Sequence, residues 1–198
     1  LGPSVENEEY ATRQVKNQSE KTRIAKLLAE HLPNDCSLFM GIGTTIEAVA
    51  RELIVAHQHL RVITNNIHIA SIITRRPDFE VIITGGVVRA KDGGITGVAT
   101  LDMIDQFKVD YVIMGANGID NDGTLLDFDY REVRATKAMM TNARQRVLVA
   151  DSSKFGRSAM MKVCHISEVN AVFTDEPPPP ELMPHITEHA VRLYVAEY

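Results

Sequence analysis

The fold class follows from the segment Ser37-Leu38-Phe39-Met40-Gly41-Ile42-Gly43-Thr44-Thr45-Ile46-Glu47. Its apolar run, residues 38–40, lies between turn-forming residues, which is typical of a strand that is buried on both faces. Gly41 and Gly43 lack a Cβ, so they permit a tight turn and the close approach of a ligand to the backbone. The stretch therefore predicts a buried strand, a short glycine turn and then the start of a helix.

The residues after the glycines favour a binding function for this turn. Thr44 and Glu47 have the spacing of a capping box, and apolar residues then recur at helical spacing as far as Ile54. The free N–H groups of the first helical turn and the hydroxyls of Thr44 and Thr45 form a potential anion site, so we interpret the turn as a phosphate cradle. The motif has no Walker lysine and lacks the full dinucleotide fingerprint, and a purely structural strand-to-helix turn has the same pattern.

The composition is that of an ordinary globular protein. The chain has 198 residues, enough for one domain or two small ones, and no apolar run approaches the ~20 residues of a membrane-spanning helix. The two cysteines, Cys36 and Cys164, indicate no disulfide framework, and no signal peptide is evident, so we expect a cytoplasmic location. The formal charge of −5 argues against direct nucleic-acid binding by this surface, and the start at Leu1 suggests a piece of a longer protein.

Strands and helices alternate along the chain after a polar, aperiodic segment, residues 1–17, which we interpret as a linker or arm. The predicted helices begin near Ser19 and cover about 19–32, 44–54, 67–75, 98–107, 130–143 and a segment ending near 190. The predicted strands cover 37–40, 60–64, 79–84, 109–114, 146–150, 170–174 and 191–196. This alternation predicts an α/β fold with a mostly parallel sheet and helices on both faces.

Small or polar residues follow several of the predicted strands. In open α/β sheets the ligand crevice lies outside the carboxyl ends of the strands, so residues 41–45, Asn65-Asn66 and Gly85-Gly86 are expected to meet along one rim. Lys154 follows another strand end and is the best candidate to pair with an anion there. Arg89 and Lys91 lie in a loop that could close over the same pocket, although exposed cations are common on protein surfaces.

Acidic residues suggest a second interpretation. Asp127, Asp129 and Glu132 could supply a base for proton abstraction, which together with a phosphate cradle and a lysine would describe a sugar-phosphate isomerase. Alternatively, Asp129 is a helix N-cap, with Glu132 at the capping-box position and no catalytic role. His185 and His189 are four residues apart on a predicted helix, but no third ligand suggests itself, so no metal site is expected.

Seven short motifs occur in a characteristic order, namely GIGTTIEAVA (41–50), VITNN (62–66), the glycine pair 85–86 with RAKDGGITGVATL (89–101), GANGID (115–120), GTLLDFDYREVR (123–134), DSSKFGRSAM (151–160) and TDEPPPP (174–180). Each motif alone is weak, but their order and spacing together are specific. With these motifs the chain resembles the effector-binding domain of DeoR-type bacterial transcriptional repressors from about Ser19 to near its end.

The resemblance implies a fold like that of ribose-5-phosphate isomerase and CoA-transferases, with the sugar-phosphate site used for sensing rather than for catalysis. It implies a phosphorylated small-molecule inducer, with sn-glycerol 3-phosphate favoured, whose phosphate lies on residues 43–45. It implies no cofactor, no metal and no catalytic residue. The candidate ligand-binding residues are Gly41, Gly43, Thr44, Thr45, Asn65, Asn66, Gly85, Gly86, Arg89, Asn117, Glu132 and Lys154.

The resemblance also implies an organisation beyond this chain. A winged helix-turn-helix domain would precede this chain and make the only contacts with operator DNA. Residues 1–17 would be the interdomain linker, and residues 18–198 would form the sensor domain. A homodimer or homotetramer is expected. Two departures stand out: many family members have an aspartate at the position of Gly41, and Asn117 lies where the isomerase has a carboxylate. An active sugar-phosphate isomerase, or a CoA-transferase-like enzyme using Glu132, remains the alternative.

Overall fold

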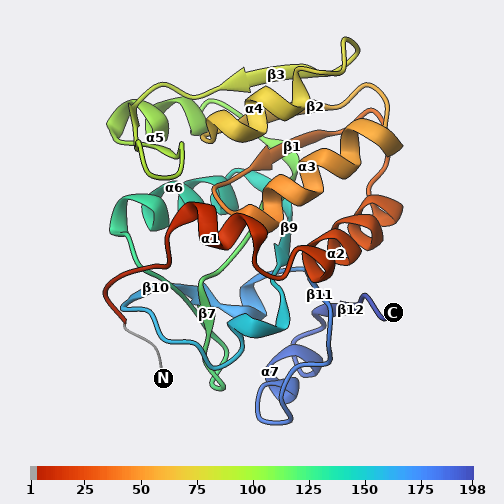
Figure 1. Ribbon diagram of the computed structural model, residues 1–198, viewed down its shortest axis with the longest axis vertical. Coiled ribbons are helices and arrows are strands. Elements are labelled where there is room, and N and C mark those ends of the chain that lie inside the picture. Colours follow the sequence, from red (N-terminus) through yellow and green to blue (C-terminus); the bar gives the residue numbers. More distant parts are fainter. Residues whose placement is uncertain (1–3) are drawn as a thin grey trace.

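A parallel sheet forms the centre of the computed structural model, which describes residues 4–198 (Figure 1). The sheet has seven strands in the order β12-β11-β9-β6-β1-β2-β3, and every pairing within it is parallel. The strands are β1 (Ser37–Met40), β2 (Arg61–Thr64), β3 (Glu80–Ile83), β6 (Val109–Met114), β9 (Ala143–Val149), β11 (Ala171–Thr174) and β12 (Arg192–Val195). The α/β fold class predicted from the alternation is confirmed.

Helices cover both faces of this sheet, as expected. One apolar core lies under α2 (Gln18–His31), α3 (Thr44–Ala56) and α4 (Ile67–Ile73), and includes Leu38 and Met40 of β1. The other lies under α5 (Val98–Ile104), α6 (Tyr130–Thr141) and α7 (Met183–Thr187), and includes Phe39. Successive side chains of a strand point to opposite faces, so the uninterrupted apolar run of β1 is explained by burial on both sides.

A second, antiparallel sheet is attached to the first, and the sequence did not predict it. Its strands β7 (Gly118–Ile119), β8 (Thr124–Asp127) and β10 (Met161–His165) pair in the order β10-β8-β7. A small hairpin of β4 (Val87–Val88) and β5 (Ile95–Thr96) follows β3, and two short 3₁₀ turns are η1 (Ser152–Lys154) and η2 (Ile166–Glu168). These strands have two to five residues, too few for their period to be separated from the surrounding turn signals.

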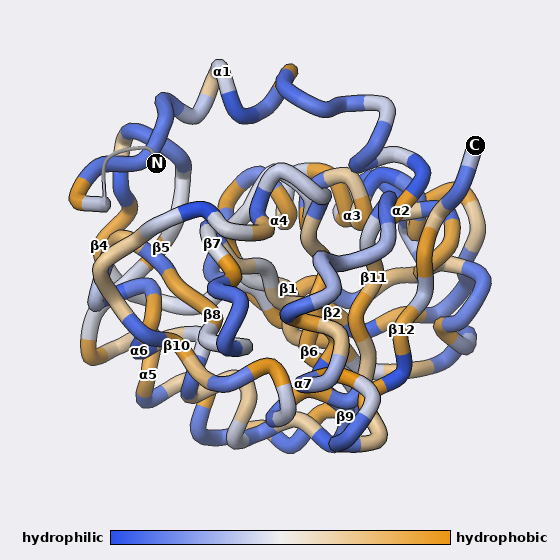
Figure 2. The backbone as a smooth tube through the Cα atoms, turned by 90° about the horizontal axis from the view of Figure 1, so that it is seen from below, coloured by the Kyte–Doolittle hydropathy of each residue, from blue (hydrophilic) through white to orange (hydrophobic). Residues whose placement is uncertain are grey.

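The segment before α2 is also more ordered than its sequence pattern suggested. It contains α1 (Tyr10–Val15), a helix with no buried residue. Figure 1 shows α1 passing between α2 and α6, and in Figure 2 its tube is mostly hydrophilic and lies at the edge of the molecule. We name residues 7–17 the arm, because polar contacts and not the apolar core hold them on the domain.

The ends of the helices follow the sequence rules only in part. The capping box at α3 was a wrong prediction, because Gly43 is the N-cap and no side chain caps the helix, while Glu47 accepts a hydrogen bond from the Tyr10 hydroxyl at 2.6 Å. At α6 the Asp129 carboxylate accepts from the backbone N–H of Arg131 at 2.8 Å, as predicted. Within residues 4–198 no helix has the length and apolar character needed to span a membrane.

Candidate functional site

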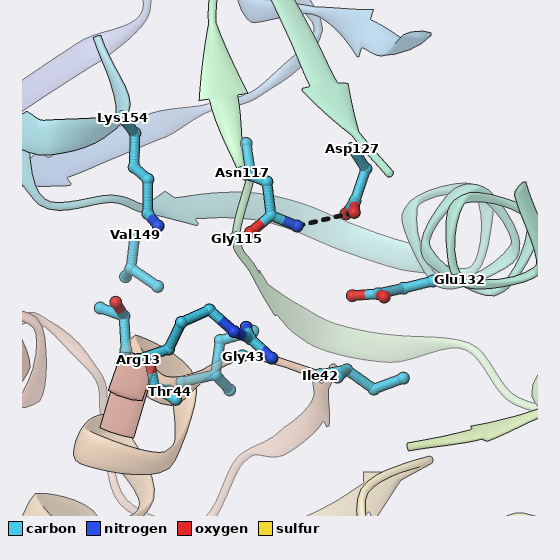
Figure 3. Close-up of a pocket in the computed structure, with 13 residues that line it drawn as sticks. Arg13, Ile42, Gly43, Thr44, Gly115, Asn117, Asp127, Glu132, Val149 and Lys154 are labelled. Atoms are coloured by element: carbon cyan, nitrogen blue, oxygen red, sulfur yellow. Dashed lines mark hydrogen bonds between the residues drawn. The ribbon is translucent and has the colours of Figure 1, made fainter. Parts of the chain in front are cut away.

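A cavity opens at the carboxyl ends of the central strands β1, β6 and β9 (Figure 3). Ligand crevices of open α/β sheets lie at this edge. The cavity is lined by Arg13, Ile42, Gly43, Thr44, Thr45, Ile46, Gly115, Ala116, Asn117, Asp127, Glu132, Val149 and Lys154. Its residues therefore come from the arm, both sheets, the start of α3, the first turn of α6 and the η1 turn.

One end of the cavity is formed by the glycine turn and the start of α3. Thr44 and Thr45 are the first two residues of the helix, and both are more than nine-tenths buried. N–H groups in a first helical turn have no partner inside the helix, and within residues 4–198 those of Thr44, Thr45 and Ile46 have none elsewhere. This end thus combines free donors with the positive end of a helix dipole, an arrangement that favours an anion.

Lys154 brings a positive charge to the same end. Its side chain reaches the cavity from the η1 turn, and within residues 4–198 its Nζ forms no hydrogen bond and no ion pair. Burial lowers the pKa of Lys154 to about 8, and the neighbouring cations Arg157, Lys21 and Arg13 add to this, whereas Asp151 opposes it. The cations around Lys154 thus outnumber the neighbouring carboxylates, Asp151 and Glu8, so a bound anion would be stabilised here.

The opposite end of the cavity carries two carboxyl groups. Asp127 accepts hydrogen bonds from the Asn117 amide and from the Phe128 N–H, each at 2.7 Å. Burial raises the pKa of Glu132 to about 8, with a further contribution from Asp127, while Arg89 opposes the rise. Burial also raises the pKa of Asp127. Near neutral pH this pair therefore retains a proton, and it can both donate hydrogen bonds to ligand hydroxyls and accept them.

Arg89 does not face the cavity, contrary to what its loop position suggested. Its guanidinium donates to Asp92 at 2.7 Å, to Glu132 at 3.0 Å and to Asp129 at 3.1 Å. Three carboxylates therefore hold this side chain, and it holds Glu132 in turn. Arg89 and Lys91 line a neighbouring cavity of about 440 Å³, which lies under the arm.

A family model described as the DeoR C terminal sensor domain matches residues 16–176 of this chain. The chain is also 48% identical over 193 residues to the glycerol-3-phosphate regulon repressor of Escherichia coli (strain K12), a match that covers 98% of this chain and 76% of that protein. The chain belongs to the DeoR sensor-domain family. It is therefore a ligand-sensing domain of the kind found in DeoR-type transcriptional repressors.

A further relative and two solved structures are consistent with the membership of this chain in the DeoR sensor-domain family. The glycerol-3-phosphate regulon repressor of Haemophilus influenzae is 43% identical over 175 residues, covering 88% of this chain and 68% of that protein. Ribose 5-phosphate isomerase A of Methanocaldococcus jannaschii has a TM-score of 0.51 at 16% identity, covering 71% of this chain and 55% of its own. A chain of the eIF2B-beta2-delta2 complex of Chaetomium thermophilum has a TM-score of 0.59 at 12% sequence identity, and the match covers 86% of this chain and 60% of that chain. These two structures share the fold with this domain.

The DeoR sensor domain brings six of the twelve candidate residues together in the cavity, namely Gly43, Thr44, Thr45, Asn117, Glu132 and Lys154. Gly41 lines a smaller adjacent cavity together with Asp127 and Glu132. Gly85 and Gly86 are exposed and, like Arg89, Asn65 and Asn66, are absent from the cavity lining. The predicted single rim therefore covers β1 but does not extend to β2 and β3.

Asn65 and Asn66 have structural partners instead. The Asn65 amide donates to the carbonyl oxygen of Ile95 at 3.1 Å, and the Asn66 side chain accepts from the N–H of His68 at 2.9 Å, capping α4. Both side chains are almost fully buried. They fasten the loop of residues 85–97 to the main sheet, and a direct ligand contact for them stays a prediction.

Sequence reasoning did not name two charged residues of the cavity, Arg13 and Asp127, as ligand-binding candidates. Arg13 lies in the aperiodic arm, where no pattern indicated a structural role. Asp127 was considered only as a catalytic base, although it follows the apolar pair Leu125-Leu126 at the end of β8, much as the other rim residues follow their strands. That pattern is the signal that could have identified Asp127.

Three of the seven histidines, His165, His185 and His189, form a cluster away from the cavity. The ring of His165 lies 5.2 Å from that of His185 and 6.1 Å from that of His189, measured between ring centroids. The two ring nitrogens of His165 form hydrogen bonds with the Ser167 hydroxyl and with the carbonyl oxygen of Asp122. Within residues 4–198 no group of three His, Cys, Asp or Glu side chains is arranged to hold a metal ion.

Proposed function

We propose that this domain binds a phosphorylated small molecule, sn-glycerol 3-phosphate being favoured, in the cavity described above and releases it unchanged. The observation that carries the proposal is the unpaired Lys154 ammonium beside the free N–H groups of residues 44–46. A phosphate with two negative charges complements both groups. The names of the relatives in Escherichia coli and Haemophilus influenzae support glycerol 3-phosphate as the first ligand to test.

The two ends of the cavity suit the two ends of such a molecule. The phosphate would lie on residues 43–45 and Lys154, and the hydroxyl groups would reach Asn117, Asp127 and Glu132. The cavity has a volume of about 30 Å³, which holds one or two water molecules. An effector of this size therefore requires side chains at the cavity to move, and the neighbouring cavity of about 440 Å³ offers the space to do so.

The signal from this site would reach DNA through another domain. In our proposal a winged helix-turn-helix domain precedes residue 18, with residues 1–17 as its linker, and alone contacts operator DNA. An effector shifts a conformational equilibrium only through different affinities for the two states, so the bound state would be the one with low operator affinity. We propose a cytoplasmic homodimer or homotetramer, since repressors of this kind read paired half-sites.

Isothermal titration calorimetry with sn-glycerol 3-phosphate tests the proposal. The double variant Thr44→Ala/Thr45→Val removes both hydroxyls, and we expect at least a tenfold loss of affinity. Thr22→Ala, which removes an exposed hydroxyl on α2, is the matched control and should bind like the wild type. Equal affinity in all three proteins, or equally tight binding of glycerol without phosphate, would contradict the cradle.

A sugar-phosphate isomerase is the second candidate function. The specific observation in its favour is the Asp127–Glu132 pair, since a carboxyl group with a raised pKa can transfer protons. The repressor names of the relatives argue against it. Incubation of the domain with ribose 5-phosphate and other sugar phosphates, followed by NMR, decides the matter: turnover that is lost in Glu132→Gln would establish an enzyme, and unchanged substrate supports a sensor.

A further inference from the structure

The arm is attached to the domain through polar contacts at the edge of the cavity. Helix α1 has no buried residue, and the Tyr10 ring stacks on the ring of His68 with the centroids 4.9 Å apart. In addition, the Tyr10 hydroxyl donates to Glu47 at 2.6 Å, and the Asn7 amide donates to the Asn117 side-chain oxygen at 3.1 Å. Glu47 lies in the first turn of α3, and Asn117 lines the cavity. The arm is thus held by elements that also build the site.

Arg13 extends from the arm into the cavity itself. Its Nε donates to the carbonyl oxygen of Glu8 at 3.1 Å, and within residues 4–198 this is the only hydrogen bond of its guanidinium, which has no ion pair. Figure 3 shows the guanidinium beside the turn at Gly43, with the Lys154 amine directed toward the same space. Two positively charged side chains without carboxylate partners therefore face one small cavity.

Like charges at this distance repel each other unless an anion lies between them. Lys16, Lys21 and Arg157 line an adjoining small cavity together with Arg13 and Lys154, and these five cations outnumber the two carboxylates there, Glu8 and Asp151. A guanidinium presents paired N–H donors that match two phosphate oxygens, which an ammonium cannot do. The chemistry of Arg13 thus suits the same phosphate that Lys154 and the α3 turn would bind.

We propose that Arg13 is an effector-binding residue that clamps the phosphate from the side opposite to the sheet, so that the arm closes when the effector binds. This inference rests on the proposed function and deepens it. The family match begins at residue 16, so Arg13 lies outside the part of the chain that the match covers. The arm is also the segment through which any preceding domain would be connected, so its closure would transmit occupancy of the cavity.

Calorimetry with sn-glycerol 3-phosphate on the 198-residue chain tests the role of Arg13. We expect Arg13→Gln to weaken binding at least tenfold and Arg13→Lys to weaken it less, because the charge remains but the paired donors are lost. Lys26→Gln removes an exposed cation from α2 and serves as the charge-matched control, which should bind like the wild type. An Arg13→Gln variant with wild-type affinity would overturn the inference.

Hydrogen–deuterium exchange tests the closure of the arm separately. Saturating effector should slow exchange of the amides of residues 8–16 in the wild type by several-fold. In Arg13→Gln this protection should be absent, even at an effector concentration that saturates the variant. Unchanged exchange in a wild-type protein that binds the effector overturns arm closure while leaving the proposed function intact. A wild-type chain that binds no glycerol 3-phosphate in calorimetry refutes the glycerol 3-phosphate assignment itself.

Discussion

Burial shifts the pKa values of several side chains in this cavity away from their ordinary range. Lys154 is the clearest case, because its charge lies beside other cations and lacks a carboxylate partner of its own. The acidic end has the converse arrangement, with Asp127 and Glu132 sharing a site that Arg89 only partly neutralises. Perturbed groups of this kind cluster at functional sites, which makes their titration a direct test of the proposed site.

Effector affinity should depend on pH through Lys154. Its pKa is lowered to about 8, so the ammonium is largely intact below pH 8 and is lost as the pH rises above it. Phosphate monoesters keep both negative charges in this range, so affinity should fall up to tenfold per pH unit above 8. Lys154→Met should bind ~10–100-fold more weakly at pH 7, the equivalent of ~1.5–3 kcal/mol, and show little pH dependence.

Lys154→Arg provides the control for that measurement. Its guanidinium stays charged at pH 9.5, so this variant should retain affinity there if charge is what the effector requires. Calorimetric titrations at pH 7, 8 and 9.5 compare the three proteins. Parallel pH profiles for the wild type and Lys154→Met would show that another group is responsible.

Glu132 should make the domain less stable as the pH rises. Burial raises its pKa to about 8 in the folded state, whereas an unfolded glutamate titrates near ~4.3. Between these values the folded state binds more protons than the unfolded state, so the free energy of unfolding falls as the pH increases from about 4.5 to about 8. Urea unfolding at pH 5.5 and pH 8 should show this decline in the wild type and a smaller one in Glu132→Gln. An equal decline of the free energy of unfolding between pH 5.5 and pH 8 in both proteins would contradict this role of Glu132.

At the level of elements, the sequence predicted those helices and strands that have a long apolar run or a clear hydrophobic period. The strands and helices of the main sheet appear near their expected positions because residues such as Phe39 and Val112 are buried on a sheet that has two covered faces. The antiparallel strands β7, β8 and β10 were missed because each has only two to five residues, and because β10 pairs with a strand that lies far from it in the sequence, with Met161 opposite Asp127. The arm was missed because polar tertiary contacts, which leave no periodic signal, position it.

The antiparallel sheet nevertheless positions Asn117 and Asp127 of the cavity, and a substitution at Gly118 can test this role. A Cβ at this residue would collide with the carbonyl oxygen of Arg157, a backbone atom that cannot move away easily. Gly118→Ala should cost ~1–3 kcal/mol in the free energy of unfolding, and it should weaken effector binding because Asn117 is adjacent. Urea unfolding and calorimetry measure the two effects.

Gly85→Ala is the matched control for this glycine. A Cβ there meets only Ala99 at 3.7 Å, an ordinary van der Waals contact, and Gly85 is exposed and distant from the cavity lining. The variant should leave stability and affinity unchanged. A clear loss of affinity in Gly85→Ala would instead restore Gly85 to the binding site, as the sequence had suggested.

For the whole molecule, the cavity was predictable from strand order only in outline. The rule that ligands bind at the carboxyl ends of strands led to residues 43–45 and Lys154, since these immediately follow β1 and β9. Asn65 and Gly86 follow β2 and the edge strand β3, where the loop of residues 85–97 packs over the strand ends, and they are absent from the cavity lining. A ligand contact for them stays a prediction. Which strands are central is a property of the topology, and the sequence pattern does not contain it.

That same sheet edge carries exposed apolar residues and should form the contact between subunits. Strand β3 is the edge of the seven-stranded sheet, and Ile83, Val87, Val88 and Val98 next to it are 43%, 69%, 49% and 71% exposed. Figure 2 shows the segment at β4 as hydrophobic on the outside of the molecule. Exposed apolar edges of this kind are normally covered by a partner, and a second copy of the chain fits the expected homo-oligomer.

Light scattering coupled to size-exclusion chromatography can test this interface. The double variant Val87→Glu/Val98→Glu places charges on the edge, and burying them against a second copy would be costly, so the molar mass should fall to that of the monomer. Val55→Glu alters an equally exposed valine on α3, 77% exposed, and should leave the mass unchanged. A dimer that persists in the Val87→Glu/Val98→Glu variant would place the interface elsewhere. None of the three valines lines the cavity, so effector affinity measured alongside should not change in either variant.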